Sequence, residues 1–277
     1  MRSEVILFSY TKNLERVCAA AMRSCYSPHS SFQLFENKEG KVLPDEKPFD
    51  DERVSNLIKK AFELGHHDVL EHGELTFDIR NVSRALTHQL VRHRLASFSQ
   101  QSQRYVKITR SFGYIKPPSF KEHKVKMKFK GIDLELSFED VIEFCKLAEE
   151  AFLNLGIKAE DTRYLRPNAA TTNITTTMNP RQLLHVYSLR CAPDAQWEIR
   201  DLAWAMFSCS KLIAPTLFNT IPIVNIHKEV KERNELLNQI IAEIKPNFKK
   251  IGEGEIMEIP LDRLALEHEV KAYVVKL

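Results

Sequence analysis

Residues 74–80 read Glu-Leu-Thr-Phe-Asp-Ile-Arg, with polar and apolar side chains alternating at every position. Successive side chains of a strand point to opposite faces of a sheet, so this stretch predicts a half-buried strand. Apolar residues recur at helical spacing just before it, over 54–64, where Asp50 or Asp51 can cap a helix that Gly65 ends. The fold is therefore expected to mix strands with helices.

The rest of the chain supplies further elements of both kinds. Residues 169–178 are threonine-rich and favour a strand, and the Asn179-Pro180 pair that follows is a strong helix start. We also expect a strand over 5–8, a loop over 26–50, a strand near 104–110, an alternating stretch over 125–129, and helices over 14–23, 82–91, 137–155, 193–209 and 228–243. These elements predict an α/β (α+β) protein with a single mixed-sheet domain flanked by helices. Residues 1–225 are expected to form that domain and residues 226–277 a C-terminal extension of unknown role.

Composition narrows the class of protein. The 277 residues are 43% hydrophobic and 28% charged, with a formal net charge of +3, which is ordinary for a soluble globular protein. No run approaches the roughly 18 apolar residues of a membrane span, and the apolar stretch at the N-terminus is too short for a signal peptide. We therefore expect a cytoplasmic protein. The five cysteines are scattered and form no C-x-x-C pair, which argues against a disulfide framework or a zinc site.

Glycine is scarce, and this limits how the protein could bind a nucleotide. The chain has only eight glycines and contains neither G-x-G-x-x-G nor G-x-x-x-x-G-K-[ST]. The usual glycine loop, whose backbone N–H groups surround a phosphate, is therefore excluded. Arginine and hydroxyl side chains would have to bind the phosphate instead.

Such side chains are concentrated in residues 92–105, which read RHRLASFSQQSQRY. Three arginines, one histidine, three serines and three glutamines share these fourteen positions. Arginine binds phosphate in a bidentate manner, and hydroxyl and amide groups add further donors. Two alternatives remain open from composition alone: a solvated basic loop that makes surface ion pairs, and a nucleic-acid-binding module that uses residues 92–110.

The spacing of residues within this cluster, together with three other segments, resembles the motifs of a known protein family. Arg92-His93-Arg94, seven residues and Ser102-Gln103-Arg104 form the first motif. The others are GHHDVLEH at 65–72, DTRYLRP at 161–167, and a block that runs from Asn179-Pro180-Arg181 to Glu198. In this order, over about residues 50–210, they resemble the motifs of the flavin-dependent thymidylate synthases.

The resemblance implies an activity and its ligands. Members of this family methylate dUMP to dTMP with 5,10-methylenetetrahydrofolate as the carbon donor, FAD as the cofactor and a reduced nicotinamide, here expected to be NADPH, as the hydride source. They are typically homotetramers whose active sites draw residues from more than one subunit. The implied protein is thus a methyltransferase of dTMP biosynthesis, with small-molecule substrates and with no nucleic-acid or membrane partner.

The resemblance also implies a role for individual residues. The residues implied for FAD are Asp68, Arg92, His93, Arg94, Gln100, Asn179, Pro180, Arg181 and His185. Those implied for dUMP are Gln89, Leu90, Val91, Arg92, Gln100, Gln101, Ser102, Gln103, Arg104, Arg163 and Arg190. Three positions depart from common family forms: Asp68 stands where Ser or Thr is usual, Gln100 replaces a glutamate and His185 an asparagine.

Arg190 is the expected catalytic residue. Its guanidinium is always charged, so it cannot donate a proton usefully, but it can stabilise a uracil that has lost its N3 proton. The alternative is a salt bridge between helices, from Arg190 to Asp194 or Glu198.

Other polar residues invite readings that we consider weaker. Ser102 would need a base to act as a nucleophile, and His93 is the only imidazole nearby in sequence, so phosphate binding is the better interpretation. His66, His67 and His72 fit no standard zinc spacing, and no metal is expected. A catalytically inactive relative that serves as a scaffold is a further alternative, against which the arginine set speaks.

Overall fold

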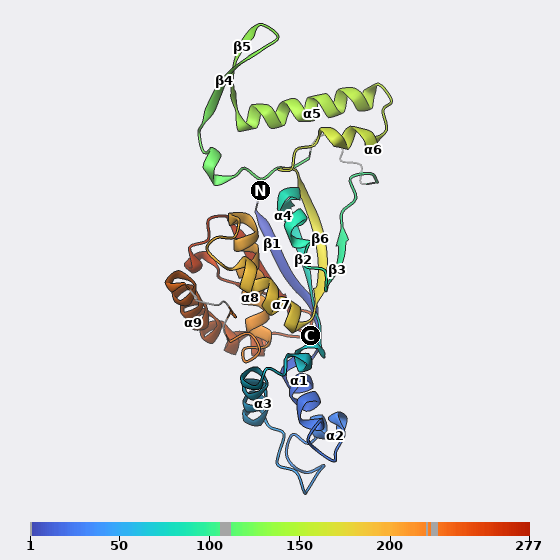
Figure 1. The fold of residues 1–277 in the computed structure, drawn as a ribbon, viewed down its shortest axis with the longest axis vertical. Coiled ribbons are helices and arrows are strands. Elements are labelled where there is room, and N and C mark those ends of the chain that lie inside the picture. Colours follow the sequence, from blue (N-terminus) through green and yellow to red (C-terminus); the bar gives the residue numbers. More distant parts are fainter. Residues whose placement is uncertain (1, 106–111, 220, 223–226) are drawn as a thin grey trace.

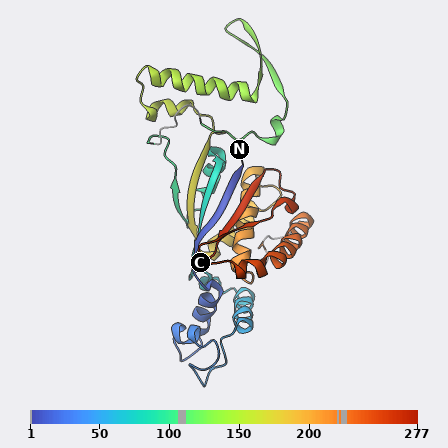
Figure 2. The same cartoon turned by 180° about the vertical axis from the view of Figure 1, so that it is seen from behind.

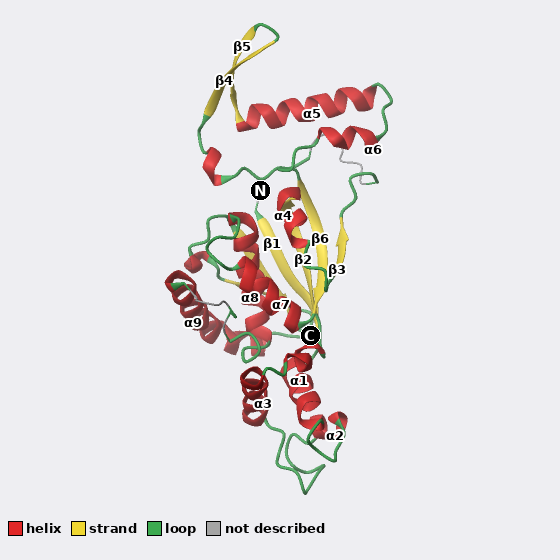
Figure 3. Ribbon diagram, viewed as in Figure 1, coloured by secondary structure: helices red, strands yellow, loops and turns green. Residues whose placement is uncertain are grey.

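A six-stranded mixed sheet forms the centre of the computed structural model, which describes residues 2–105, 112–219, 221–222 and 227–277 (Figures 1 and 3). The strands lie in the order β3-β6-β2-β1-β8-β7. Their bounds are β1 Ser3–Tyr10, β2 Leu75–Ser83, β3 Ser97–Gln100, β6 Thr171–Met178, β7 Ile256–Ile259 and β8 Val270–Val275. Only β1 and β8 are parallel, and all other neighbours are antiparallel. The predicted mixed α/β class is confirmed.

Alternation of side chains gives the sheet one fully buried face. Leu75, Phe77 and Ile79 of β2 are fully buried, as the sequence pattern predicts, whereas the residues between them are partly exposed. The same period of two runs through β1, β6 and β8. The second face of the sheet is thus left partly uncovered by the described residues.

Helices cover the buried face. They are α4 (Arg84–Leu90), α7 (Pro180–Arg190), α8 (Trp197–Ile213) and α9 (Lys228–Lys250). Helix α8 packs against β1, β8 and α7, and its aromatic residues Trp204 and Phe207 are fully buried in the core. The predicted start of α7 is confirmed, because Asn179 caps the helix and Pro180 occupies its first turn. Helix α8 begins four residues later than Pro193, because the side chain of Gln196 accepts hydrogen bonds from the N–H groups of Glu198 and Ile199.

Three helices lie at one end of the sheet, as both views of the ribbon show (Figures 1 and 2). They are α1 (Leu14–Ser24), α2 (Ser31–Glu36) and α3 (Asp51–Leu64), followed by the 3-10 helix η1 (His67–Glu71). The expected cap of α3 at Asp50 and its end at Gly65, where φ is 73°, are confirmed. The stretch 26–50 is not wholly loop, because a capping box between Ser30 and Gln33 starts α2.

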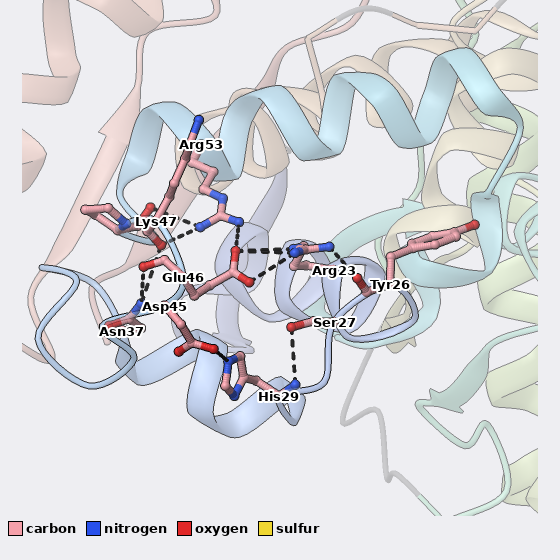
Figure 4. Close-up of polar contacts among 10 residues, drawn as sticks. Arg23, Tyr26, Ser27, His29, Asn37, Asp45, Glu46, Lys47 and Arg53 are labelled. Atoms are coloured by element: carbon pink, nitrogen blue, oxygen red, sulfur yellow. Dashed lines mark hydrogen bonds and ion pairs between the residues drawn. The ribbon is translucent and has the colours of Figure 1, made fainter.

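Side-chain contacts order the long connection between α2 and α3 (Figure 4). The fully buried Asn37 accepts hydrogen bonds from the backbone N–H groups of Val42 and Leu43. Glu46 forms ion pairs with Arg23 and Arg53, which lie on α1 and α3. These arginines hold the pKa of Glu46 below its usual value. The connection is therefore fixed by polar contacts that no periodicity of the sequence reveals.

The other end of the molecule carries a hairpin and a long helix (Figure 1). A short η2 (Pro118–Phe120) leads to the hairpin strands β4 (Lys124–Phe129) and β5 (Ile132–Ser137), which are followed by α5 (Phe138–Asn154), α6 (Ala159–Thr162) and η3 (Arg163–Leu165). The helix expected over 137–155 is confirmed, and a capping box between Ser137 and Asp140 starts it. A buried ion pair, 2.6 Å from Arg166 Nη2 to Glu149 Oε1, joins α5 to the segment that contains Arg163.

The segment beyond residue 226, expected as an extension, takes part in the central sheet. Helix α9 begins at Lys228, as predicted, and η4 (Asp262–Leu264) separates β7 from β8. Strand β8 pairs in parallel with β1, from Ser3 opposite Val270 to Leu7 opposite Val274. None of the helices in the described ranges combines the length and the hydropathy of a membrane-spanning segment. The strand expected near 104–110 falls mostly outside the described residues.

Candidate active site

Helix α4 places the first part of the polar cluster. Ser83 caps the helix by accepting a 3.0 Å hydrogen bond from the N–H of Leu86. Glu198 of α8, which is 2% exposed, accepts in turn from the N–H of Ser83 at 2.8 Å and from its Oγ at 2.5 Å. Burial raises the pKa of Glu198. This buried contact fixes the helix that carries Gln89, Leu90 and, just past its end, Val91 and Arg92.

His93 and Arg190 are brought together from opposite halves of the chain. Arg190 Nε donates a 3.1 Å hydrogen bond to His93 Nε2, and the ring of His185 meets the ring of His93 edge-on, with 6.0 Å between centroids. His93 is 5% exposed, and its burial, together with the charge of Arg190 and the proximity of His185, lowers its pKa to about 4. At neutral pH the imidazole is therefore neutral, and we assign its proton to Nδ1 because Nε2 accepts.

Arg190 is held in a way that leaves most of its guanidinium available. Among the described residues, only its Nε is engaged, and its partner is neutral. Burial and the nearby charge of Arg92 lower the pKa of Arg190, but a guanidinium stays protonated at any physiological pH. Among the described residues Arg190 forms no salt bridge with Asp194 or Glu198, and the carboxylate of Glu198 accepts from Ser83 instead. Both Nη groups can therefore bind an anionic ligand.

The start of α7 presents a second set of donors. Asn179 uses its Oδ1 to accept a 2.8 Å hydrogen bond from the N–H of Gln182, so its amide nitrogen remains for another partner. Arg181 and His185 are exposed four residues apart, on one face of α7 near its positive N-terminus. Arg181 pairs with Glu71 of η1, the element that also carries the exposed Asp68.

A side-chain hydrogen bond joins the end of β3 to helix α4. Gln100 Nε2 donates to Thr87 Oγ1 at 2.9 Å, so the side chain at this departure from the family pattern is hydrogen-bonded inside the fold. Gln101 follows through a backbone hydrogen bond to Asn173. Ser102 Oγ accepts from the N–H of Arg104 at 3.2 Å, and the only imidazole nearby in sequence already accepts from Arg190. This geometry gives no support to the nucleophile reading of Ser102.

Arginines gather around Glu160, a residue that sequence reasoning did not single out. Arg104 Nη2 lies 3.0 Å from Glu160 Oε2, and Arg163 Nε donates to the backbone oxygen of Glu160 at 3.0 Å. Arg84, at the start of α4, has a lowered pKa because of burial and the charge of Arg163. The structure thus brings together the predicted Arg104 and Arg163 and adds Arg84. In the sequence, Glu160 could have been noticed only because it lies three residues before Arg163, a predicted phosphate-binding residue.

Three of the remaining predicted residues are Arg92, Arg94 and Gln103. Arg92 and Arg94 are exposed in the turn that follows α4, and Gln103 is half-buried beside Ser102. The arginines around Glu160 and the pair of His93 with Arg190 share no direct contact. In the described ranges no group of three or more His, Cys, Asp or Glu could hold a metal ion, and His67 instead lies 5.9 Å from the ring of Phe62.

This set of side chains is suited to phosphorylated ligands. Guanidinium groups without a buried carboxylate partner bind phosphate strongly, and the N-terminus of α7 adds a positive end. The donor set also fits a flavin nucleotide. Arg92, Arg94 and Arg181 are exposed donors, and the ring of the exposed His185 contacts the buried ring of His93.

Comparison with protein families gives a match over most of the chain. The family model described as thymidylate synthase complementing protein matches residues 6–216. Flavin-dependent thymidylate synthase from Geobacter sulfurreducens is 40% identical over 216 residues, covering 78% of this chain and 85% of that protein. The proteins of the same name from Clostridium tetani and Saccharolobus solfataricus are 39% identical, covering 79% of this chain and 86% of theirs, and 35% identical, covering 88% of each.

A solved structure shares the fold. The UMP/dUMP methylase PolB from Streptomyces cacaoi, bound with 5-Br dUMP, superposes with a TM-score of 0.57 at 24% sequence identity. The match covers 78% of this chain and 93% of that one. At this identity the likeness concerns the arrangement of strands and helices.

Proposed function

The chain belongs to the flavin-dependent thymidylate synthase family, and from this premise we propose that it methylates dUMP to dTMP with 5,10-methylenetetrahydrofolate as carbon donor, FAD as cofactor and NADPH as reductant. The observation that carries the proposal is the hydrogen bond from Arg190 to a neutral, buried His93. This hydrogen bond fixes Arg190 through Nε and leaves both of its Nη groups to donate to a ligand. This is the arrangement that an anionic pyrimidine needs.

We assign the binding of dUMP to two groups of residues. Arg104 and Arg163 would hold the 5′-phosphate together with Ser102, since guanidinium and hydroxyl groups donate to phosphate oxygens. Arg190 would face the uracil ring, and residues at the end of α4 and in the segment after β3 would contact the rest of the nucleotide. The substrate-contacting set is Gln89, Leu90, Val91, Arg92, Gln100, Gln101, Ser102, Gln103, Arg104, Arg163 and Arg190.

Arg190 carries the chemical role in this proposal. When uracil loses its N3 proton, negative charge spreads over the ring, and a fixed guanidinium in a partly dry site stabilises that charge. The donor groups are already oriented, because His93 holds Nε, so little reorganisation is needed. Arg190 thereby makes the uracil carbon that receives the methylene group more nucleophilic.

FAD would be held by donors at the ends of α4 and α7. These are Arg92, His93, Arg94, Gln100, Asn179, Pro180, Arg181 and His185, with Asp68 on the adjoining η1. A bound flavin supplies the hydride that completes the methyl group. The chain contributes Arg181, which must leave Glu71 to contact a phosphate, and the adjoining rings of His93 and His185.

We further propose a homotetramer with shared active sites in the cytoplasm, without a nucleic-acid or membrane partner. The partly uncovered face of the central sheet supports self-association, because Ile6 and Phe8 of β1 lie on it, with Phe8 41% exposed. A second subunit that covered this face would remove apolar surface from water.

Two measurements test the proposed function. The purified protein should absorb as a flavoprotein and release FAD on denaturation. The variant Arg190→Ala should bind FAD as the wild type does but form dTMP about 100- to 1000-fold more slowly, since it loses a group that stabilises developing charge. Wild-type turnover by this variant would remove the role of Arg190. Arg263→Ala is a suitable control, because its exposed guanidinium pairs with Glu243 of α9 at 2.7 Å.

A further inference from the structure

The carboxylate of Glu160 lies against the arginines that we assign to the phosphate of dUMP. Glu160 Oε2 lies 3.0 Å from Arg104 Nη2, while the backbone oxygen of Glu160 accepts from Arg163 Nε at 3.0 Å. Lys158 Nζ approaches the other carboxylate oxygen at 4.0 Å. One glutamate thus contacts both arginines that are assigned to the phosphate.

We propose that Glu160 is an internal competitor of the substrate phosphate, which must displace its carboxylate from Arg104 before dUMP can bind. The inference rests on the proposed function, because it concerns the same site. A carboxylate and a phosphate both accept hydrogen bonds from a guanidinium fork, so Arg104 cannot serve both fully at once. Glu160 then sets the affinity for the nucleotide and favours ligands whose charge can replace its own.

The local structure allows the exchange. The side chain of Glu160 is 39% exposed, so it can turn into solvent without leaving a buried charge unpaired. Its backbone oxygen would still accept from Arg163, so this movement leaves Arg163 in place. Arg84 adds a further positive charge beside Arg163, and burial of its side chain makes an anion in the cluster more favourable.

If the contact between Glu160 and Arg104 were only a surface ion pair, substitution of Glu160 would affect ligand affinity differently. Such pairs contribute little to stability, and a neutral glutamine at position 160 would then leave ligand affinity unchanged. A competitor, in contrast, weakens the binding of every phosphate that uses Arg104 and has no effect on a nucleoside without phosphate. The two cases differ in the ratio of dUMP affinity to deoxyuridine affinity.

The test uses the full-length protein with FAD and compares wild type, Glu160→Gln and the control Glu143→Gln. Glu143 is also an exposed glutamate in a surface ion pair, with Lys146 at 3.7 Å, so its substitution makes the same change in net charge. Dissociation constants are measured by calorimetry for dUMP, deoxyuridine and inorganic phosphate at low salt. We expect Glu160→Gln to bind dUMP and phosphate about three- to tenfold more tightly, with deoxyuridine unchanged and with no effect of Glu143→Gln.

A second variant separates contact from charge. Glu160→Asp keeps the charge but is too short to hold the same contact with Arg104, so it should bind dUMP more tightly than the wild type. The competitor role is overturned if Glu160→Gln binds dUMP and phosphate no more tightly than the wild type, or if Glu160→Asp equals the wild type. Failure of the wild type to bind dUMP at all would instead overturn the proposed function, and inorganic phosphate would still decide the role of Glu160.

Discussion

The hydrogen bond between His93 and Arg190 can be broken at one end while the arginine is kept. His93→Leu removes the acceptor of Arg190 Nε. This 3.1 Å bond is the one hydrogen bond that the Arg190 side chain forms with the described residues. A hydrogen bond to a charged group contributes about 1.5–3 kcal/mol, and about 1.4 kcal/mol corresponds to a factor of ten in rate. We therefore expect kcat to fall about 10- to 100-fold. His93→Gln, whose side-chain oxygen can accept the same bond, should recover part of the loss.

The pKa of His93 adds a test by pH. Its folded value of about 4 lies below the usual 6.5, so the unfolded chain takes up a proton on this ring before the folded chain does. The contribution of a neutral His93 to stability is complete above pH 6.5 and is lost as the pH falls toward 4. His93→Gln should remove this component, so its unfolding free energy should depend less on pH between 6.5 and 4 than that of the wild type.

Steady-state formation of dTMP and urea unfolding at several pH values measure these two effects. FAD binding must be measured in parallel, since His93 is also assigned to the flavin. The reasoning is refuted if His93→Leu keeps wild-type kcat at saturating FAD and dUMP, or if His93→Gln leaves the pH dependence of stability unchanged.

Three further substitutions test other parts of the structure. Arg92→Ala should weaken binding of both dUMP and FAD by about tenfold, because one guanidinium is assigned to both ligands, and equal dissociation constants in calorimetry would contradict the shared site. Glu149→Ala leaves the buried Arg166 without its partner and should destabilise the α5–η3 region by about 3–5 kcal/mol, seen as faster hydrogen exchange there; unchanged exchange would rule out this anchor. Burial raises the pKa of Asp201 to about 6, so its ionisation costs stability as the pH rises from 4 to 6. Asp201→Asn should therefore raise Tm at pH 7 by about 2–4 °C and leave it unchanged at pH 4, whereas a lower Tm at pH 7 would show that the charge is needed.

Local patterns were sufficient to predict most individual elements. The alternation in β2, the cap of α3 at Asp50, the capping box at Ser137 and the start of α7 at Asn179 each depend on neighbouring residues. Such signals are encoded within a few positions, so they can be read without knowledge of the fold. The expectation that residues 92–105 bind phosphate likewise depends on residue type alone, and it stays a prediction.

Contacts between distant segments could not be predicted in this way. The parallel pairing of β1 with β8 joins the two ends of the chain, and nothing in the pattern of either strand specifies its partner. The hydrogen bond of Glu198 to Ser83 spans 115 positions, and that of Arg190 to His93 spans 97. The role of Glu160 is of the same kind, because only folding places it beside Arg104.

The most direct test of this account is a reaction in which purified protein, dUMP, FAD, NADPH and 5,10-methylenetetrahydrofolate are combined, with omission of each component in turn. We predict that dTMP forms in the complete mixture and that omitting the reductant, the folate or dUMP abolishes it, while protein stripped of FAD regains activity only when FAD is restored. A protein that remains colourless with added FAD and forms no dTMP in the complete mixture would contradict the account.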